Sequence, residues 1–181
     1  MTRTPRWAAT AALCLALAAC GDSGEDSLAS APSAAAEIPC PTQAATVDAP
    51  SGVGDDLKTR PKVPANSGEV PTAVQVADIV KGDGPEARPG SQVAVKYVGA
   101  VDKNGKEFDA SWNSSPEQTI DYQACGQDVV AGFSVAPVGM KVGGRRLVRI
   151  PDAFGYPGGN PGAGIAAGDA ITFVIDLVKV S

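Results

Sequence analysis

The feature that most limits how this chain can fold is a series of short segments of alternating apolar and polar residues, all of which follow Pro71. Such alternation predicts strands with one buried face. The segments cover residues 73–80, 92–99, 106–109, 145–150 and 170–180. Gly and Pro residues separate them, and the Asn104-Gly105 pair favours a tight hairpin turn before the third segment. We therefore expect many short strands joined by turns.

A single helix is expected among these strands, over residues 128–136. Val129, Val130 and Phe133 share one face at helical spacing. Asp128 suits the N-terminal end of such a helix. Many short strands around one helix predict an α+β domain. At about 110 residues, the patterned region is long enough to bury one modest core.

Residues 1–19 predict a signal peptide. Two arginines precede an apolar run over residues 8–19, which is too short to span a membrane. The run ends in Leu17-Ala18-Ala19-Cys20, which resembles a bacterial lipobox. In a lipobox the cysteine begins the mature protein and carries acyl chains such as palmitate, so Cys20 is the expected lipidation site. The alternative is an ordinary secretory signal with an incidental cysteine.

Between the lipidation site and the patterned region, the sequence has little signal for regular structure. Residues 21–36 are rich in Gly, Ser, Ala and acidic residues, which predicts a flexible spacer. Residues 37–68 carry scattered apolar residues among prolines and are expected to lie over the domain without a core of their own. The predicted organisation is a lipoprotein signal peptide at 1–19, a lipidated cysteine with a flexible extension at 20–69, and a folded domain at 70–181. Because two acyl chains suffice for stable anchoring, the expected location is the extracytoplasmic side of the cell membrane, through the lipid anchor.

Two cysteines remain once the signal peptide is removed and Cys20 is lipidated, namely Cys40 and Cys125. An even number of cysteines in an oxidising compartment favours a disulfide. Such a bond would attach the N-terminal extension to the folded domain. Two separate thiols are the alternative, because the sequence does not give the distance between the two Cα atoms.

Charge and composition exclude several kinds of function. The chain has 15 basic and 20 acidic residues and a net charge of −5, which argues against a nucleic-acid partner because that affinity comes mainly from Lys and Arg. It has no histidine, which excludes His-based acid–base catalysis, Ser-His-Asp triads and most catalytic zinc sites. The basic cluster of Arg145, Arg146 and Arg149 is expected to be a solvated strand face.

In this order, the patterned segments resemble an FKBP-type peptidyl-prolyl cis–trans isomerase in a bacterial lipoprotein form. The resemblance is carried by residues 81–84, 95–99, 104–111, 129–133, 139–146 and 171–177, and it covers residues 70–181. It implies a curved antiparallel β-sheet wrapped around one short α-helix, with a ligand pocket between the two. It also implies a monomer that isomerises Xaa–Pro bonds in proline-containing polypeptides and needs neither a metal nor a cofactor.

The same resemblance implies which residues form the pocket. The expected catalytic residues are Tyr97, Asp109 and Tyr156, whose polar groups would lie near the amide. The expected substrate-binding residues are Phe108, Val129, Val130, Phe133, Ile165 and Phe173.

The function implied by the resemblance is to assist the folding of exported proteins at the outer face of the cell membrane. The alternative is a non-catalytic FKBP-like chaperone or partner-binding lipoprotein. Asp109 with Tyr97 and Tyr156 favours the enzyme. Phe133 stands where the family usually has Trp, and Gln118 stands where an aromatic residue is common, so these two residues favour the alternative.

Overall fold

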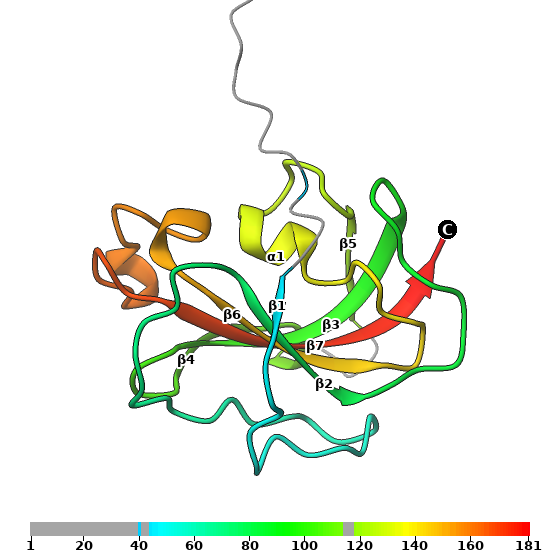
Figure 1. Cartoon of the computed structure of the whole chain (residues 1–181), viewed down its shortest axis with the longest axis horizontal. Coiled ribbons are helices and arrows are strands. Elements are labelled where there is room, and N and C mark those ends of the chain that lie inside the picture. The colour runs from blue at the N-terminus through cyan, green and yellow to red at the C-terminus, as the bar shows by residue number, and fades with distance from the viewer. Residues whose placement is uncertain (1–39, 41–43, 114–117) are drawn as a thin grey trace, which may run out of the picture. The chain divides into compact units, whose positions relative to one another are not determined.

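The computed structural model describes residues 40, 44–113 and 118–181. The signal peptide predicted at 1–19 and the lipidation predicted at Cys20 lie outside the described residues. In the described part, one curved sheet wraps around a single short helix (Figure 1). This is the α+β fold that the resemblance implied. No helix in this part is long and apolar enough to cross a membrane.

The sheet has seven strands among the described residues, in the spatial order β1-β2-β6-β7-β3-β4, and β5 pairs with β3. The strands are β1 (Ala45–Thr46), β2 (Gln75–Val80), β3 (Gln92–Val101), β4 (Lys106–Ala110), β5 (Ile120–Gln123), β6 (Arg145–Ile150) and β7 (Ile171–Val180). Neighbouring strands are antiparallel except β1 and β2, which run parallel. The turn predicted at Asn104-Gly105 joins β3 to β4. Gly105 has a φ of 65°, a left-handed conformation that favours glycine.

The five strands predicted from alternation correspond to β2, β3, β4, β6 and β7, whereas β1 and β5 were not predicted. β5 has only four residues, although Ile120 and Tyr122 alternate with polar neighbours. β1 has two residues, and it becomes a strand only by pairing with Gln75 and Val76 of β2. Local periodicity carries no signal for a strand of that length.

The main core lies between the helix, α1 (Ala131–Val135), and the face of the sheet turned toward it, which we call the inner face. Alternate residues of β7 point into this core: Ile171, Phe173, Ile175 and Leu177 are at most 5% exposed. Register shifts in β3, between Ala94 and Val95 and between Gly99 and Ala100, interrupt its pairing with β7 and β4. Such bulges increase the local twist of a sheet, which helps it curve around α1.

The helix is shorter than the predicted range 128–136. Val130 is its N-cap and has an extended backbone, with φ −57° and ψ 142°, so residues 128–130 stay outside the helix. No side chain caps the first turn. The prediction that Asp128 begins the helix is therefore wrong, and its carboxylate is available for other contacts.

Residues 47–66, which follow β1, lie over the opposite face of the sheet, which we call the outer face (Figure 1). Val53 is 3% exposed and belongs to a small second core with Ala77, Leu147 and Val174 of the sheet. This part of the extension is therefore packed on the domain. The domain boundary predicted at residue 70 stays a prediction.

The prediction that the arginines of β6 form a solvated strand face is wrong. Arg145 is 0% exposed, and it donates to the two carboxylate oxygens of Asp176 over 2.6 and 2.7 Å. Its Nη1 donates to the backbone carbonyl of Gly54 over 2.9 Å, and its Nη2 donates also to that of Thr59 over 3.0 Å, both in the extension. The buried guanidinium thus joins the sheet to the segment that covers its outer face.

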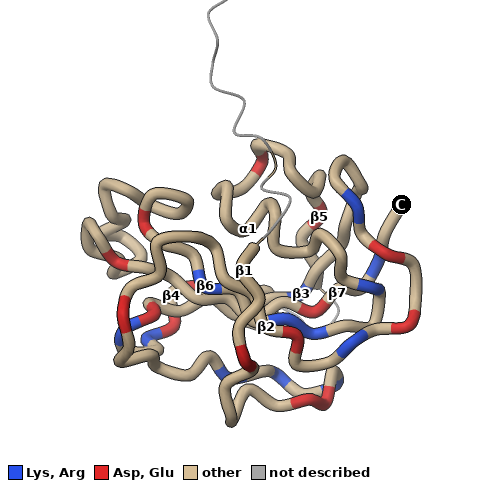
Figure 2. The backbone as a smooth tube through the Cα atoms, viewed as in Figure 1, with Lys and Arg blue, Asp and Glu red and all other residues tan. Residues whose placement is uncertain are grey.

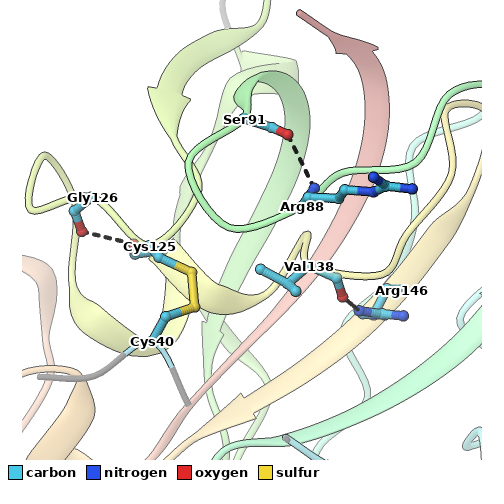
Figure 3. Close-up of a disulfide and its surroundings, with 8 residues drawn as sticks. Cys40, Arg88, Ser91, Cys125, Gly126, Val138 and Arg146 are labelled. Atoms are coloured by element: carbon cyan, nitrogen blue, oxygen red, sulfur yellow. Dashed lines mark hydrogen bonds between the residues drawn. A yellow bond between two sulfur atoms is a disulfide. The ribbon is translucent and has the colours of Figure 1, made fainter. Parts of the chain in front are cut away.

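Arg146 makes an equivalent set of contacts on the inner face. Its Nε donates to Asp78 over 2.6 Å, and its Nη1 donates to the carbonyls of Ala136 and Val138 over 3.0 and 2.8 Å. Figure 3 shows the contact with Val138 beside the disulfide. These carbonyls follow α1 directly and would otherwise lack a donor at the end of the helix. Arg146 supplies that donor and thereby fixes the position of the helix on the sheet.

Cys40 and Cys125 form a disulfide with 5.3 Å between their Cα atoms (Figure 3). It links the chain before β1 to the turn after β5, across a sequence separation of 85 residues. We expect the unfolded, unreduced mature protein to contain no titratable thiol, and reduction to lower the unfolding free energy by about 2–4 kcal/mol because the unfolded chain is released. A thiol assay in denaturant with and without reductant checks this. Two thiols before reduction would contradict it.

Candidate functional site

A pocket of about 350 Å³ lies on the inner face of the sheet, beside the start of α1. Its lining residues are Tyr97, Phe108, Asp109, Ile120, Asp128, Val129, Val130, Phe133, Tyr156 and Phe173. Eight of the nine side chains predicted as catalytic or substrate-binding are among them. The fold brings these side chains together from β3, β4, β7, α1, the segment before α1 and the loop after β6.

The floor of the pocket is aromatic. The ring centroids of Phe133 and Phe173 are 4.7 Å apart, and those of Phe108 and Phe173 are 5.5 Å apart with perpendicular planes. The Tyr97 ring lies 5.6 Å from Phe133 in an edge-to-face arrangement. Edge-to-face pairs of this kind are favourable beyond their buried area. The floor is therefore an apolar surface whose shape is held by packed rings.

Gly99 of β3 allows these rings to approach the sheet. A Cβ atom at this position would lie 2.5 Å from the Phe173 ring and 2.9 Å from the Phe108 ring, closer than carbon atoms can approach. Glycine inside a strand often marks such an approach. The sequence signal for this feature is a glycine inside a valine-rich strand pattern.

A hydrogen-bonded pair of polar groups lies on the wall of the pocket. The Tyr97 hydroxyl donates to Oδ2 of Asp109 over 2.5 Å, and the Tyr97 backbone N–H donates to Oγ of Ser111 over 2.9 Å. Burial, followed by the hydrogen bond to Asp109 and the charge of its carboxylate, raises the pKa of Tyr97 above its ordinary value. Tyr97 is therefore a neutral donor at physiological pH. The Tyr156 hydroxyl makes no hydrogen bond to another described residue, so it remains open to a ligand.

Ile165 is the one predicted substrate-binding residue that does not line the pocket. It is 1% exposed and belongs to the main core. Its backbone exchanges two hydrogen bonds with Asn160, over 2.8 and 3.0 Å, which closes a turn at residues 160–165 in the same loop as Tyr156. The Ile165 side chain thus anchors this loop to the main core and does not face the pocket.

Two lining residues, Ile120 and Asp128, were not predicted. Ile120 belongs to β5, the strand that pattern analysis did not identify, so its position beside β3 could not be inferred. Asp128 had an ordinary explanation as a helix cap, and that explanation concealed its place in the pocket. The extended backbone at Val130 starts the helix after Asp128, and only this observation distinguishes a pocket residue from a helix cap.

Comparison with known proteins gives the class of this site. The sequence matches the family described as FKBP-type peptidyl-prolyl cis-trans isomerase over residues 84–178. It is 43% identical over 124 residues to an FK506-binding protein of Streptomyces anulatus, covering 67% of this chain and 97% of that protein. The chain belongs to the FKBP-type peptidyl-prolyl isomerase family. Its enzymatic class is therefore that of a peptidyl-prolyl cis–trans isomerase, as the resemblance implied.

Further FKBP relatives agree with this chain in sequence and in fold. A probable FK506-binding protein of Corynebacterium glutamicum is 39% identical over 121 residues, covering 66% of this chain and 98% of that protein. The solved structure of AtFKBP13 has a TM-score of 0.53 and 28% identity, covering 62% of this chain and 96% of that chain. The curved sheet and single helix are thus the FKBP fold.

The pocket of this chain is packed around Phe133, which stands at a position where FKBP isomerases usually have Trp. Phe133 is 3% exposed. The Tyr122 ring packs beside it, with 5.3 Å between the two ring centroids. The Tyr122 hydroxyl donates to the Phe133 carbonyl over 3.2 Å. Burial raises the pKa of Tyr122, so this donor also stays neutral. The smaller ring therefore leaves no gap on the side of Tyr122.

A larger cavity, of about 420 Å³, lies on the outer face beneath the extension. Two of its three charged side chains already satisfy each other, because Arg149 donates to both oxygens of Asp102 over 3.0 and 2.8 Å and Thr172 donates to the same carboxylate; the third, Asp48, is exposed. A ligand would have to compete with these contacts. Across residues 40, 44–113 and 118–181, no group of three or more side chains suited to a metal ion is found. The inner-face pocket is therefore the candidate active site of this isomerase.

Proposed function

We propose that this protein is a membrane-anchored prolyl isomerase that accelerates the folding of exported polypeptides at the outer face of the cell membrane. The observation that carries the proposal is the Tyr97–Asp109 hydrogen bond on the wall of a pocket with an aromatic floor. Asp109 is exposed, so the hydrogen bond is not needed to compensate a buried charge; it holds the carboxylate in place at the wall of the pocket. Family membership supports the chemistry, and the N-terminal sequence supports the location.

The reaction needs no nucleophile and no metal. Rotation about an Xaa–Pro amide crosses a barrier of about 18–20 kcal/mol because the planar amide is stabilised by resonance. In the twisted transition state this resonance, and the charge separation that accompanies it, is lost. A pocket of low polarity therefore favours the twisted amide over the planar one, and this difference is what catalysis requires.

Eight of the ten lining residues have a role in this proposal. The rings of Phe108, Phe133 and Phe173 hold the proline ring against the floor. The Tyr156 hydroxyl, which is open to a ligand, donates to a carbonyl of the substrate. Asp109, oriented by Tyr97, lies beside the amide that rotates. Val129 and Val130 complete the wall at the start of α1.

The experiment that tests the activity is a measurement of cis–trans exchange on a short Ala-Xaa-Pro-Phe peptide by exchange NMR. We expect the mature chain to accelerate exchange in proportion to its concentration. If the folded protein binds proline-containing peptides without acceleration, it is instead a non-catalytic FKBP-like binding protein.

We expect Cys20→Ser to move the protein from the membrane fraction to the soluble fraction, because the acyl chains at Cys20 are its only proposed anchor. Two acyl chains give stable anchoring, and their removal leaves an acidic, soluble chain. Cell fractionation with detection of the protein in each fraction checks this. A wild-type protein that is as soluble as the variant would rule out the lipid anchor.

A further inference from the structure

The charges on the pocket walls are of one sign. Two carboxylates line it, Asp109 on β4 and Asp128 before α1, and no basic side chain is among the described lining residues. Tyr97 donates a hydrogen bond to Asp109 but, as a neutral phenol, brings no positive charge. A ligand in the pocket therefore meets an acidic wall.

Asp128 is the less constrained of the two carboxylates. It is exposed, it is not the cap of α1, and it forms no ion pair with another described residue. Its neighbours Val129 and Val130 form the apolar wall beside it. Asp128 therefore presents an uncompensated charge at the rim of an apolar site.

The sequence around the pocket reinforces this charge. No Lys or Arg occurs between Lys106 and Lys141, or between Arg149 and Lys179, and these two stretches supply all the lining residues except Tyr97. In Figure 2 the segment from β5 to α1 carries acidic positions and no basic ones.

Basic residues of β3, β4 and β6, and Lys103 in the turn between β3 and β4, have contacts elsewhere. Arg149 is bound to Asp102 on the outer face, and Lys103 forms an ion pair with Asp169 over 2.6 Å. The Lys96 ammonium lies 5.0 Å from the centre of the Trp112 ring. Lys106 extends to Gly164, in the loop between β6 and β7, and does not line the pocket.

We propose that this isomerase prefers proline-containing segments with a Lys or Arg next to the proline, and that Asp128 determines this preference. The inference rests on the proposed function, since the preference is read through catalysed isomerisation. A cationic side chain beside a bound proline is attracted by Asp128 and Asp109, whereas an acidic one is repelled by both. The apolar wall beside Asp128 lowers the local dielectric constant, which strengthens both effects.

The test uses exchange NMR, because proteases used in coupled assays have charge preferences of their own. The mature chain, with Cys20→Ser to keep it in solution, is assayed on two matched peptide series with Lys, Gln or Glu placed either before or after the proline. We expect kcat/KM to follow the order Lys, Gln, Glu in at least one series. At low salt the Lys and Glu peptides should differ by about tenfold, which corresponds to a charge interaction at short range in a partly shielded site. In 1 M NaCl the ratio should approach one, because the screening length falls to about 3 Å.

Asp128→Asn should reduce the Lys-to-Glu ratio to about threefold or less. The matched control is Asp121→Asn, which removes the same charge from β5 at an exposed position beside Lys179, outside the pocket. This control should keep the wild-type ratio. Equal rates on Lys and Glu peptides in both series would overturn the inference, as would a ratio that survives Asp128→Asn. If the Gln peptides are not accelerated either, the proposed function itself has failed.

Discussion

Asp109→Asn is expected to lower kcat/KM for Xaa–Pro isomerisation by about 10- to 100-fold, while the protein stays folded. Hydrogen bonds to a charged group contribute about 1.5–3 kcal/mol, and each 1.4 kcal/mol lost from the transition state is a factor of about ten in rate. Asn keeps the size of the side chain but replaces the charged carboxylate, which accepts a hydrogen bond from the Tyr97 hydroxyl, by a neutral amide. Since Asp109 is exposed and lies outside the main core, the unfolding free energy should change by only about 1 kcal/mol.

A double-mutant cycle with Tyr97→Phe tests whether the two residues act together. Tyr97→Phe removes the donor of the hydrogen bond, whereas Asp109→Asn removes the charge of its acceptor. If the pair acts as a unit, the double variant should lose no more activity than the worse single variant. The control is Glu107→Gln on the same strand, whose carboxylate pairs with Arg60 away from the pocket. Wild-type rates for Asp109→Asn, or an equal loss for Glu107→Gln, would remove Asp109 from the mechanism.

Arg145→Met is expected to lower the unfolding free energy by about 3–5 kcal/mol, the range for breaking a buried ion pair by removing one partner. The substitution leaves the Asp176 carboxylate buried without its counter-ion. It also leaves the carbonyls of Gly54 and Thr59 without their donor, so the extension should loosen on the outer face. Urea unfolding followed by tryptophan fluorescence or circular dichroism measures the change.

The pH dependence of this variant follows from Asp176. Burial raises the pKa of Asp176, and in the wild type Arg145 opposes that shift. Without Arg145, the folded state therefore binds a proton at Asp176 more readily than the unfolded state does. A group with a raised pKa contributes stability at low pH that is lost as the pH rises through its folded-state value. The loss of unfolding free energy caused by Arg145→Met should consequently be smaller near pH 4 than at pH 7.

Two further variants separate the ion pair from general damage to the core. Arg60→Met removes an exposed ion pair with Glu107 and should cost at most about 1 kcal/mol. Arg145→Met combined with Asp176→Leu removes both buried charges and should recover much of the loss, because no unpaired ion remains. A cost below about 1 kcal/mol for Arg145→Met alone would show that Asp176 finds another partner or is reached by water.

Much of the fold follows from local pattern. Alternation identified β2, β3, β4, β6 and β7, since in each of them one face packs on the core. The strand β5 was not predicted, and the helix was predicted to begin earlier than it does. Each depends on few residues, and their ends are set by contacts with β3 and by the backbone at Val130.

Most of the site also followed from the sequence through resemblance to FKBP isomerases. The aromatic floor and the Tyr97–Asp109 pair were expected as residue types, and the structure brought them to one pocket. Ile165 differed because its side chain turns into the core beneath the loop that carries Tyr156. Asp128 was misassigned because an acid before a helix is most often a cap.

The sequence by itself determined where strands and turns begin, which family the domain resembles, and which side chains could build an apolar pocket without histidine. Only the tertiary structure decided what the charged residues do. Arg145 meets Asp176 at a separation of 31 residues, Arg146 meets Asp78 at 68, and Arg149 meets Asp102 at 47. Periodicity reports whether a position faces inward or outward over a few residues, but it carries no information about a partner from a distant strand. A buried charge is tolerated only with such a partner, so pairing of the sheet makes Arg145 and Arg146 interior residues and leaves Arg149 partly buried.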